Sequence, residues 1–423
     1  MRSAVNKTIL KNGVRIVTKK FPHTRSVSMG VWVNAGARDE SSSESGLSHF
    51  IEHMIFKGTA RRTAYQIAKE FDAIGGQTNA FTSMETTCYH AKVMDNHLET
   101  MVDILSDIFL NSVFEAQEIE KERPVIFQEI GMVEDNPEEY IHILSGRAYW
   151  GDNPMGRSIL GRPENIINFN AQALKRFFHK YYQPDRIVIA AAGNLEHQRL
   201  VELVGPAFES IVPGKDFPDR TAPATQSLVK CHARDLEQVH VCLATMGLPL
   251  NDPKRYAFSL MNSILGGNMS SRLFQEIRER RGLAYSVYSF ISSYVDTGMF
   301  GAYVGLDPKN ARVAVDLILK EMRRLKEIPV DSAELHDAKE FTKGNLFLAS
   351  ESVDNQMVRL AQNEIIFGDY IPLDTVVAKV EAVTSEELLD LAVDLFQTNA
   401  LALTLLGPVD EKNAFEDFLT LNS

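Results

Sequence analysis

The stretch Gln183-Pro-Asp-Arg-Ile-Val-Ile-Ala-Ala-Ala-Gly193 corresponds without a gap to Gln397-Thr-Asn-Ala-Leu-Ala-Leu-Thr-Leu-Leu-Gly407. Each stretch follows an expected helix that ends in an aromatic residue, and each ends in glycine. The apolar run before the glycine has the length and composition of a buried strand. The recurrence of this pattern at a long interval predicts that the chain contains two copies of one structural unit.

Other segments repeat in the same order. The apolar strand that ends at Gly36 resembles residues 239–247, and the order helix, glycine turn, helix, glycine, strand of residues 46–93 recurs in residues 255–305. Alternating residues around Asn12-Gly13 predict a β-hairpin before the first of these strands. We therefore expect an α+β fold of two homologous domains of about 200 residues, each an antiparallel-rich sheet packed with helices.

A proline-rich segment separates the two copies. Residues 212–225 contain three prolines and few apolar residues, which is typical of a linker between domains. The sequence thus predicts an N-terminal domain of residues 1–211, this linker, and a C-terminal domain of residues 226–423.

The composition limits the kinds of function. The chain has 423 residues, 44% hydrophobic residues and a formal charge of −12, which fits a soluble globular protein and argues against a nucleic-acid partner. Three dispersed cysteines favour a reducing compartment. We find no apolar stretch typical of a signal peptide and none of the ~20 residues that span a membrane. A cytoplasmic protein without membrane association is expected.

The first copy carries a metal-binding pattern. The segment Gly46-Leu-Ser-His-Phe-Ile-Glu-His-Met-Ile-Phe-Lys-Gly-Thr59 places His49, Glu52 and His53 on one face of an expected helix. Two imidazoles in this arrangement can bind Zn²⁺, and the carboxylate can take a proton from a zinc-bound water, as in the inverted H-x-x-E-H signature. The equivalent helix of the second copy, residues 255–265, has neither histidine nor acid. The three groups are therefore expected to serve chemistry rather than packing.

A third ligand is expected from the acidic helix predicted at residues 115–134. Most of its glutamates should form a solvated face. Glu122 and Glu129 are seven residues apart, so they share a face but differ by ~10 Å along the axis and cannot both contact one ion. Spacing alone leaves open which of the two is the ligand. Pro124 between them predicts that the helix begins or kinks there.

The chain resembles zinc peptidases of the pitrilysin/insulinase family, in particular the subfamily of mitochondrial-processing-peptidase-like proteins. The resemblance covers nearly the whole chain and is carried by these segments: 49–59, 75–82, 122–130, 154–161, 265–274 and 278–285. By this resemblance Glu129 is the third zinc ligand and Glu122 supports the site from nearby. Glu52 then acts as general base on the zinc-bound water.

The resemblance also implies how a substrate is held. Arg278 and Tyr285 match an Arg/Tyr pair that would stabilise the oxyanion, and Asn79, Ala80 and Phe81 fall on a strand that would pair with a peptide. Such proteins form a chamber from two subunits that admits peptides or unfolded segments. We therefore expect a homodimeric zinc endopeptidase with one Zn²⁺ per chain. A non-catalytic processing-peptidase-like or core-type subunit is the alternative.

Overall fold

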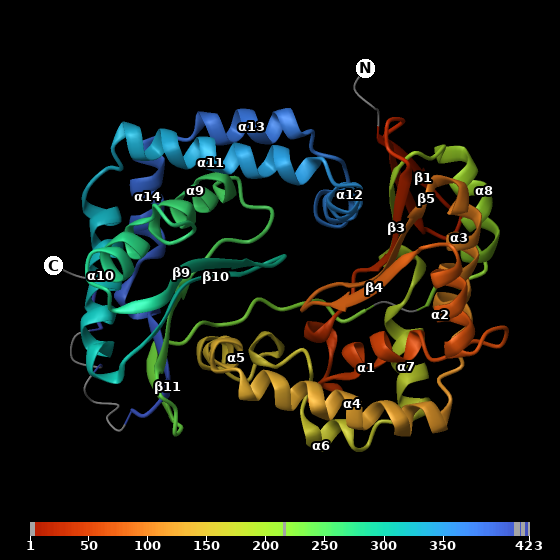
Figure 1. Cartoon of the computed structure of the whole chain (residues 1–423), viewed down its shortest axis with the longest axis horizontal. Coiled ribbons are helices and arrows are strands. Elements are labelled where there is room, and N and C mark those ends of the chain that lie inside the picture. Colours follow the sequence, from red (N-terminus) through yellow and green to blue (C-terminus); the bar gives the residue numbers. More distant parts are fainter. Residues whose placement is uncertain (1–4, 215–216, 410–414, 416–418, 422–423) are drawn as a thin grey trace. The chain divides into compact units, whose positions relative to one another are not determined.

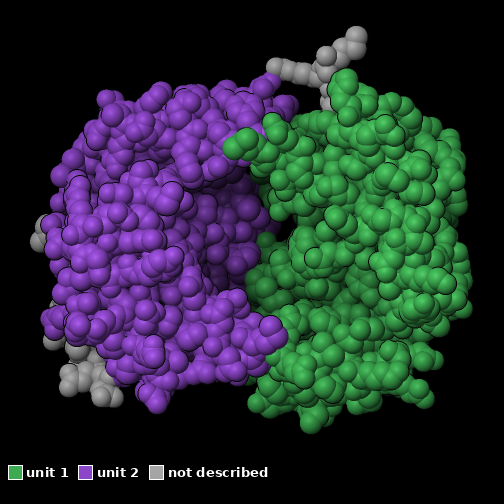
Figure 2. Space-filling view, viewed as in Figure 1, with its two compact units in different colours: residues 1–130, 157–220, 348–370 green, residues 131–156, 221–347, 371–423 purple. Residues whose placement is uncertain are grey.

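The computed structural model describes residues 5–214, 217–409, 415 and 419–421. The chain forms two sheets, each packed with helices, as the sequence predicts (Figure 1). Two compact units contain them: residues 1–130, 157–220 and 348–370 form the first unit, and residues 131–156, 221–347 and 371–423 form the second (Figure 2).

The first unit has a six-stranded sheet in the order β1-β2-β6-β3-β5-β4. All neighbours are antiparallel except β2 and β6, which are parallel. Its strands are β1 (Val5–Ile9), β2 (Arg15–Lys20), β3 (Ser26–Val33), β4 (Gln77–Thr82), β5 (Thr87–Met94) and β6 (Ile187–Gly193). Its helices are α1 (Leu47–Ile55), α2 (Ala64–Ala73), α3 (Leu98–Asn111), most of α4 (Ala116–Asp135), α6 (Pro163–Ile166), α7 (Ala171–Tyr181), α8 (His197–Phe208) and α12 (Val353–Phe367).

The second unit has a five-stranded sheet in the order β7-β11-β8-β10-β9, in which β7 and β11 form the parallel pair. Its strands are β7 (Leu228–Ala233), β8 (Val239–Met246), β9 (Ala284–Ser293), β10 (Gly298–Leu306) and β11 (Ala402–Gly407). Its helices are α5 (Pro137–Trp150), α9 (Arg255–Leu265), α10 (Ala311–Glu327), most of α11 (Ser332–Ser350), α13 (Leu373–Ala382) and α14 (Ser385–Leu395). Without β1, the two sheets have the same strand order and directions, which confirms the predicted duplication.

The glycines that end the repeated stretches have one structural cause. Gly193 ends β6 with φ of 134°, and Gly407 ends β11 with φ of 142°. A Cβ atom would lie 2.2 Å from the carbonyl oxygen of Ser26 at Gly193, and 2.6 Å from that of Gln238 at Gly407. Both the backbone conformation and the close contact therefore require glycine in each copy.

Each sheet also packs against a helix from the other half of the sequence. Ile187, Ile189 and Ala191 of β6 belong to the main core of the first unit, whereas the alternate residues Val188 and Ala190 pack against α12. In the second unit, α5 packs on the sheet through a smaller cluster that includes Ile141, Leu144, Cys242, Tyr303 and Leu406. The compact units therefore differ from a linear division at residues 212–225 by two exchanged segments, 131–156 and 348–370.

Two local predictions can be compared with these elements. The hairpin predicted around Asn12-Gly13 is present as the antiparallel pair β1 and β2. Of the two alternatives predicted at Pro124, a helix start is wrong, because α4 begins at Ala116 and Pro124 lies inside it. Among the described helices, none is both long and apolar enough to cross a membrane.

Candidate metal centre

Helix α1 is held in place by its apolar face. Leu47, Phe50, Ile51, Met54 and Ile55 are buried in the main core of the first unit. The helix begins after Gly46, whose φ of 103° suits glycine. With the apolar residues in the core, the helical period directs the remaining polar side chains to the opposite side.

Three side chains from α1 and α4 meet there. The Nε2 atoms of His49 and His53 lie 3.2 Å apart, and the Glu129 Oε2 atom lies 3.4 Å from each of them. A tetrahedral zinc ion with bonds of ~2.0–2.1 Å separates its ligand atoms by about 3.3–3.4 Å. The three atoms therefore fit three corners of a zinc tetrahedron. Within the described part of the chain, they form the group of three potential ligands that could hold a metal ion.

The ligand triangle is more exposed to solvent at Glu129 than at His49. The Glu129 side chain is 40% exposed, whereas that of His49 is 7% exposed. Hydrogen bonds with His49 and His53 hold the pKa of Glu129 well below its usual value. The carboxylate therefore stays ionised and ready to bind a cation at any physiological pH.

Glu122 lies on the other side of the His53 ring. The Nδ1 atom of His53 is 2.8 Å from Glu122 Oε1, and the second oxygen of Glu122 is 2.5 Å from the Lys57 ammonium. Burial raises the pKa of Glu122, but hydrogen bonds from His53 and Lys57 lower it by more. An ionised Glu122 favours a proton on Nδ1, which leaves Nε2 free to bind a metal. Glu122 therefore lies on the Nδ1 side of the His53 ring and outside the group of three potential ligands.

The same contacts control the protonation of His53. Burial lowers its pKa, but hydrogen bonds to Glu122 and Glu129 outweigh that effect and raise the pKa to about 9. In the metal-free protein a proton on His53 therefore balances the two carboxylates at neutral pH. Binding of a metal ion must displace this proton.

Glu52 is half-buried and lies on α1 between the two histidines. Its Oε2 atom is buried and finds no hydrogen-bond partner among the described residues. Leaving a buried carboxylate oxygen unpaired costs free energy, so such an atom is more typical of a catalytic group than of a structural one. Glu52 is therefore an available proton acceptor on the helix that carries His49 and His53.

Arg278 and Tyr285 lie in the second unit and contact each other. The guanidinium carbon of Arg278 is 4.4 Å from the centre of the Tyr285 ring and 4.8 Å from that of Phe274. The Nη1 atom of Arg278 also donates a hydrogen bond of 3.0 Å to the Tyr285 carbonyl oxygen. Arg278 belongs to a π-helical segment, Phe274–Glu279, a rare form that often marks functional sites. The Tyr285 side chain is exposed.

The expected substrate strand is β4. It lies at the end of the first sheet, pairs with β5 and packs beside α1. Asn79 and Phe81 are exposed and Ala80 is half-buried. The Asn79 side chain accepts a hydrogen bond from the backbone N–H of Ala80. The strand therefore offers an edge beside the helix that carries His49 and His53.

Lys57 contacts Glu122 at the site, a role that was not predicted from the sequence. It follows His53 by four residues just beyond the end of α1, so the helical period placed it near the histidine. Its importance depends on Glu122, which comes from another helix, and only the tertiary structure brings the two together.

Comparisons with known proteins agree with this geometry. The family model described as Insulinase (Peptidase family M16) matches residues 15–162, and that described as Peptidase M16 inactive domain matches residues 168–341. The uncharacterized zinc protease YmxG of Bacillus subtilis is 41% identical over 398 residues, covering 94% of this chain and 97% of that protein. An uncharacterized zinc protease of Streptomyces coelicolor is 36% identical over 424 residues, covering 97% and 91% respectively. The solved structure of a protease from Helicobacter pylori has a TM-score of 0.90 at 23% identity and covers 96% of this chain and 99% of that one.

Fold and site together define a two-domain α+β protein with a group of three potential metal ligands in its first half. The chain belongs to peptidase family M16, the insulinase family. Its relatives are named as zinc proteases, so membership of this family suggests a metallopeptidase activity. The model described as inactive matches mainly the second half, where the helix equivalent to α1 has neither histidine nor acid.

Proposed function

We propose that this chain is a zinc-dependent endopeptidase that hydrolyses peptides or unfolded polypeptide segments, with one zinc ion per chain. The observation that carries the proposal is the triangle of His49, His53 and Glu129, together with the unpaired Glu52 Oε2 atom on the helix that supplies both histidines. Neither packing nor stability accounts for these four ionisable side chains.

When bound, zinc would act as a Lewis acid that polarises the peptide carbonyl and acidifies a water molecule. Glu52 takes a proton from the attacking water and passes it to the nitrogen of the leaving amine. Glu122 accepts a hydrogen bond from His53 Nδ1 and thereby fixes the ring with its Nε2 atom at one corner of the ligand triangle. The Lys57 ammonium keeps Glu122 ionised for this task.

Two further groups complete the proposal. The edge strand β4, with Asn79, Ala80 and Phe81, binds an extended peptide through backbone hydrogen bonds, which gives affinity with modest sequence preference. Arg278 and Tyr285 stabilise the negative charge on the carbonyl oxygen, from either the same chain or its partner. The exposure of the Asn79, Phe81 and Tyr285 side chains supports these assignments.

A chamber formed by a homodimer is part of the proposal and is checked by light scattering of the purified chain. The closer relation to mitochondrial-processing-peptidase-like proteins and the cytoplasmic location stay predictions from the sequence. A non-catalytic subunit is the alternative function. The presence of all three ligands together with Glu52 favours the enzyme, because a non-catalytic role needs no proton acceptor beside the ligands.

The test is cleavage of a quenched fluorescent peptide library by the purified protein, with and without a chelator. Glu52→Gln should keep its zinc but lose activity by about 10²–10⁴-fold, because the amide cannot accept the proton. The exposed Glu115, also an acid of the α4 region, provides the control variant Glu115→Gln, which should retain full activity. Activity that survives the chelator, or that persists in Glu52→Gln, would refute the mechanism. Zinc bound by an inert wild-type protein would support the alternative.

A further inference from the structure

The segment before α1 contains three consecutive charged residues that are all shielded from water. The side chains of Arg38, Asp39 and Glu40 are at most 5% exposed. Burial of a charged group is costly unless partners replace the lost water. Each of the three has partners in a different part of the first unit.

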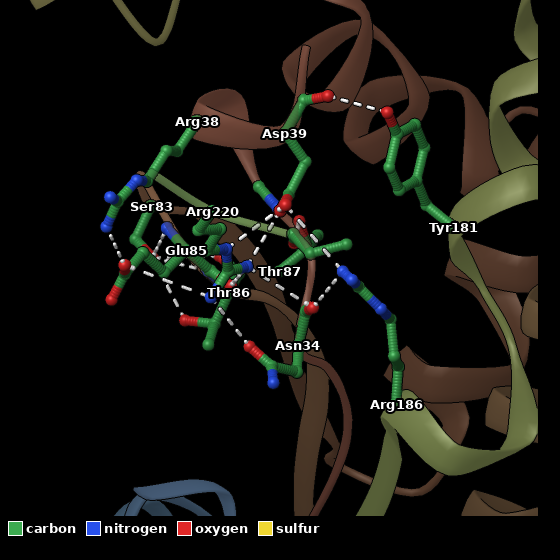
Figure 3. Close-up of polar contacts among 12 residues, drawn as sticks. Asn34, Arg38, Asp39, Ser83, Glu85, Thr86, Thr87, Tyr181, Arg186 and Arg220 are labelled. Atoms are coloured by element: carbon green, nitrogen blue, oxygen red, sulfur yellow. Dashed lines mark hydrogen bonds and ion pairs between the residues drawn. The ribbon is translucent and has the colours of Figure 1, made fainter. Parts of the chain in front are cut away.

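Arg38 and Asp39 fix the path of this segment. Arg38 pairs with Glu85, in the turn between β4 and β5, at 2.6 Å. The Asp39 carboxylate accepts two hydrogen bonds from Arg220, and its carbonyl oxygen accepts one of 2.7 Å from the Tyr181 hydroxyl (Figure 3). The chain before Glu40 is therefore anchored to the turn between β4 and β5, to the helix α7, and to Arg220 at the end of the segment 157–220.

The backbone of Glu40 itself is also held. Its carbonyl oxygen accepts a hydrogen bond of 2.9 Å from Arg157, in the loop that leads to Gly161. Gly161 and Gly46 pack so closely that a Cβ atom on Gly161 would lie 2.5 Å from the Cα atom of Gly46. The loop, Glu40 and the start of α1 therefore form one tightly packed layer.

The Glu40 carboxyl group reaches the first turn of α1. Its Oε2 atom accepts the backbone N–H of Gly46 at 2.8 Å, and its Oε1 atom accepts that of Ser48 at 2.7 Å. Gly46, the residue before the helix, has no side chain that could cap these N–H groups. Glu40 supplies the missing acceptors from outside the helix, at the end where an acid is favourable. The second of these donors, Ser48, immediately precedes His49.

We propose that Glu40 is a positioning residue of the metal centre, which sets α1 so that His49 and His53 meet Glu129 of α4. This inference rests on the proposed metal-binding role of these three residues. A ligand triangle with edges of 3.2 to 3.4 Å joins two separate helices, so a small shift of α1 would open it. Two hydrogen bonds at the helix start restrain both its translation and its rotation.

Glu40 occupies an environment that is unfavourable for an isolated carboxyl group. Burial raises its pKa to about 8, although the hydrogen bonds from Ser48 and Gly46 lower it. Keeping an acid away from water costs free energy of folding, and the two hydrogen bonds from the start of α1 offset part of that cost. The geometry of the two backbone donors explains why two acceptor oxygens are needed.

The test compares Glu40→Gln with Glu44→Gln in the full chain. The amide replaces one of two acceptor oxygens by an NH₂ group, which cannot accept from a backbone N–H. Glu44 is a matched control, because it lies in the same segment and its side chain accepts from Ser41 of its own turn. Zinc affinity is measured by competition with a chelator, and Co²⁺ serves as a probe whose visible absorption reports ligand geometry. Circular dichroism of the metal-free variants shows whether they are folded.

We expect folded Glu40→Gln to bind zinc about tenfold or more weakly and to change the cobalt spectrum, whereas Glu44→Gln matches the wild type. Wild-type zinc affinity together with a wild-type cobalt spectrum in Glu40→Gln overturns the inference. If Glu40→Gln does not fold, Glu40→Asp, with both acceptors on a shorter side chain, is measured instead. Weaker zinc binding by folded Glu40→Asp supports the inference, and unchanged binding overturns it.

These results are separable from the proposed peptidase activity. A wild-type chain that binds zinc but cleaves no peptide refutes the proposed function, while the role of Glu40 is still judged on metal affinity. A wild-type chain that binds neither zinc nor cobalt refutes both.

Discussion

Zinc binding to this chain should release a proton from His53. Hydrogen bonds to Glu122 and Glu129 outweigh the effect of burial and raise the pKa of His53 to about 9. At pH 7, about two units lower, about 99% of the metal-free protein therefore carries this proton. Because zinc binds only the neutral imidazole, each ion must displace one proton at neutral pH.

The size of the effect follows from that pKa. The apparent zinc affinity should rise about tenfold per pH unit between pH 6.5 and 8.5 and level off above about pH 9. The stability of the metal-free fold should change with pH in the opposite direction. A pKa raised from 6.5 to about 9 adds stability to the metal-free fold that is fully present below pH 6.5 and is lost as the pH rises through 9.

Chelator competition at half-unit steps of pH measures the affinity, and calorimetry in two buffers of different ionisation enthalpy counts the protons released. In Glu122→Gln the pKa of His53 should fall towards its usual value, so the affinity should level off at lower pH. Glu118→Gln is the control, because Glu118 lies on the same helix but pairs with Lys121. Equal zinc affinity at pH 7 and pH 9, or no proton released at pH 7.5, would show that this reasoning is wrong.

Two other predictions concern the scaffold and the second unit. Gly161→Ala should lower the free energy of unfolding by more than about 1 kcal/mol, measured by denaturant titration, because φ is +81° and a Cβ atom would strike the backbone of Gly46. Gly131→Ala in α4, where a Cβ atom meets no described atom within 4 Å, should be neutral or stabilising. Arg278→Lys should reduce kcat by about 10²-fold or more without changing zinc content, because lysine lacks the planar group that stacks on Tyr285. Unchanged kcat would remove Arg278 from the proposed mechanism.

Much of the fold follows from patterns within short windows. The alternation around Asn12-Gly13 and the apolar runs at β6 and β11 result from side-chain periods that act locally, so they can be identified without tertiary contacts. The repeat of whole segments then indicates two equivalent sheets. Pro124 shows the limit of local rules. The helix α4 does not start at this proline, because it extends on both sides of it.

The packing of α5 and α12 could not be predicted from such patterns. Each helix lies in one half of the sequence and covers the sheet of the other half. An apolar helix face shows that the helix has a partner, but it does not identify which sheet provides it. A division of the chain at residues 212–225 therefore follows the order of the sequence and does not account for these two exchanged helices.

The candidate site divides in the same way. His49, Glu52 and His53 could be assigned to one face from the sequence alone, because helical geometry places residues three and four apart side by side. The packing of α1 against α4 was needed to show that Glu129 completes the triangle, whereas Glu122 contacts the far side of His53. Glu122 and Glu129 share a face of α4, but they meet different atoms of the His53 ring. Glu122 lies 2.8 Å from Nδ1, and Glu129 lies 3.4 Å from Nε2. Contacts such as these join residues distant in sequence, and no local period encodes them.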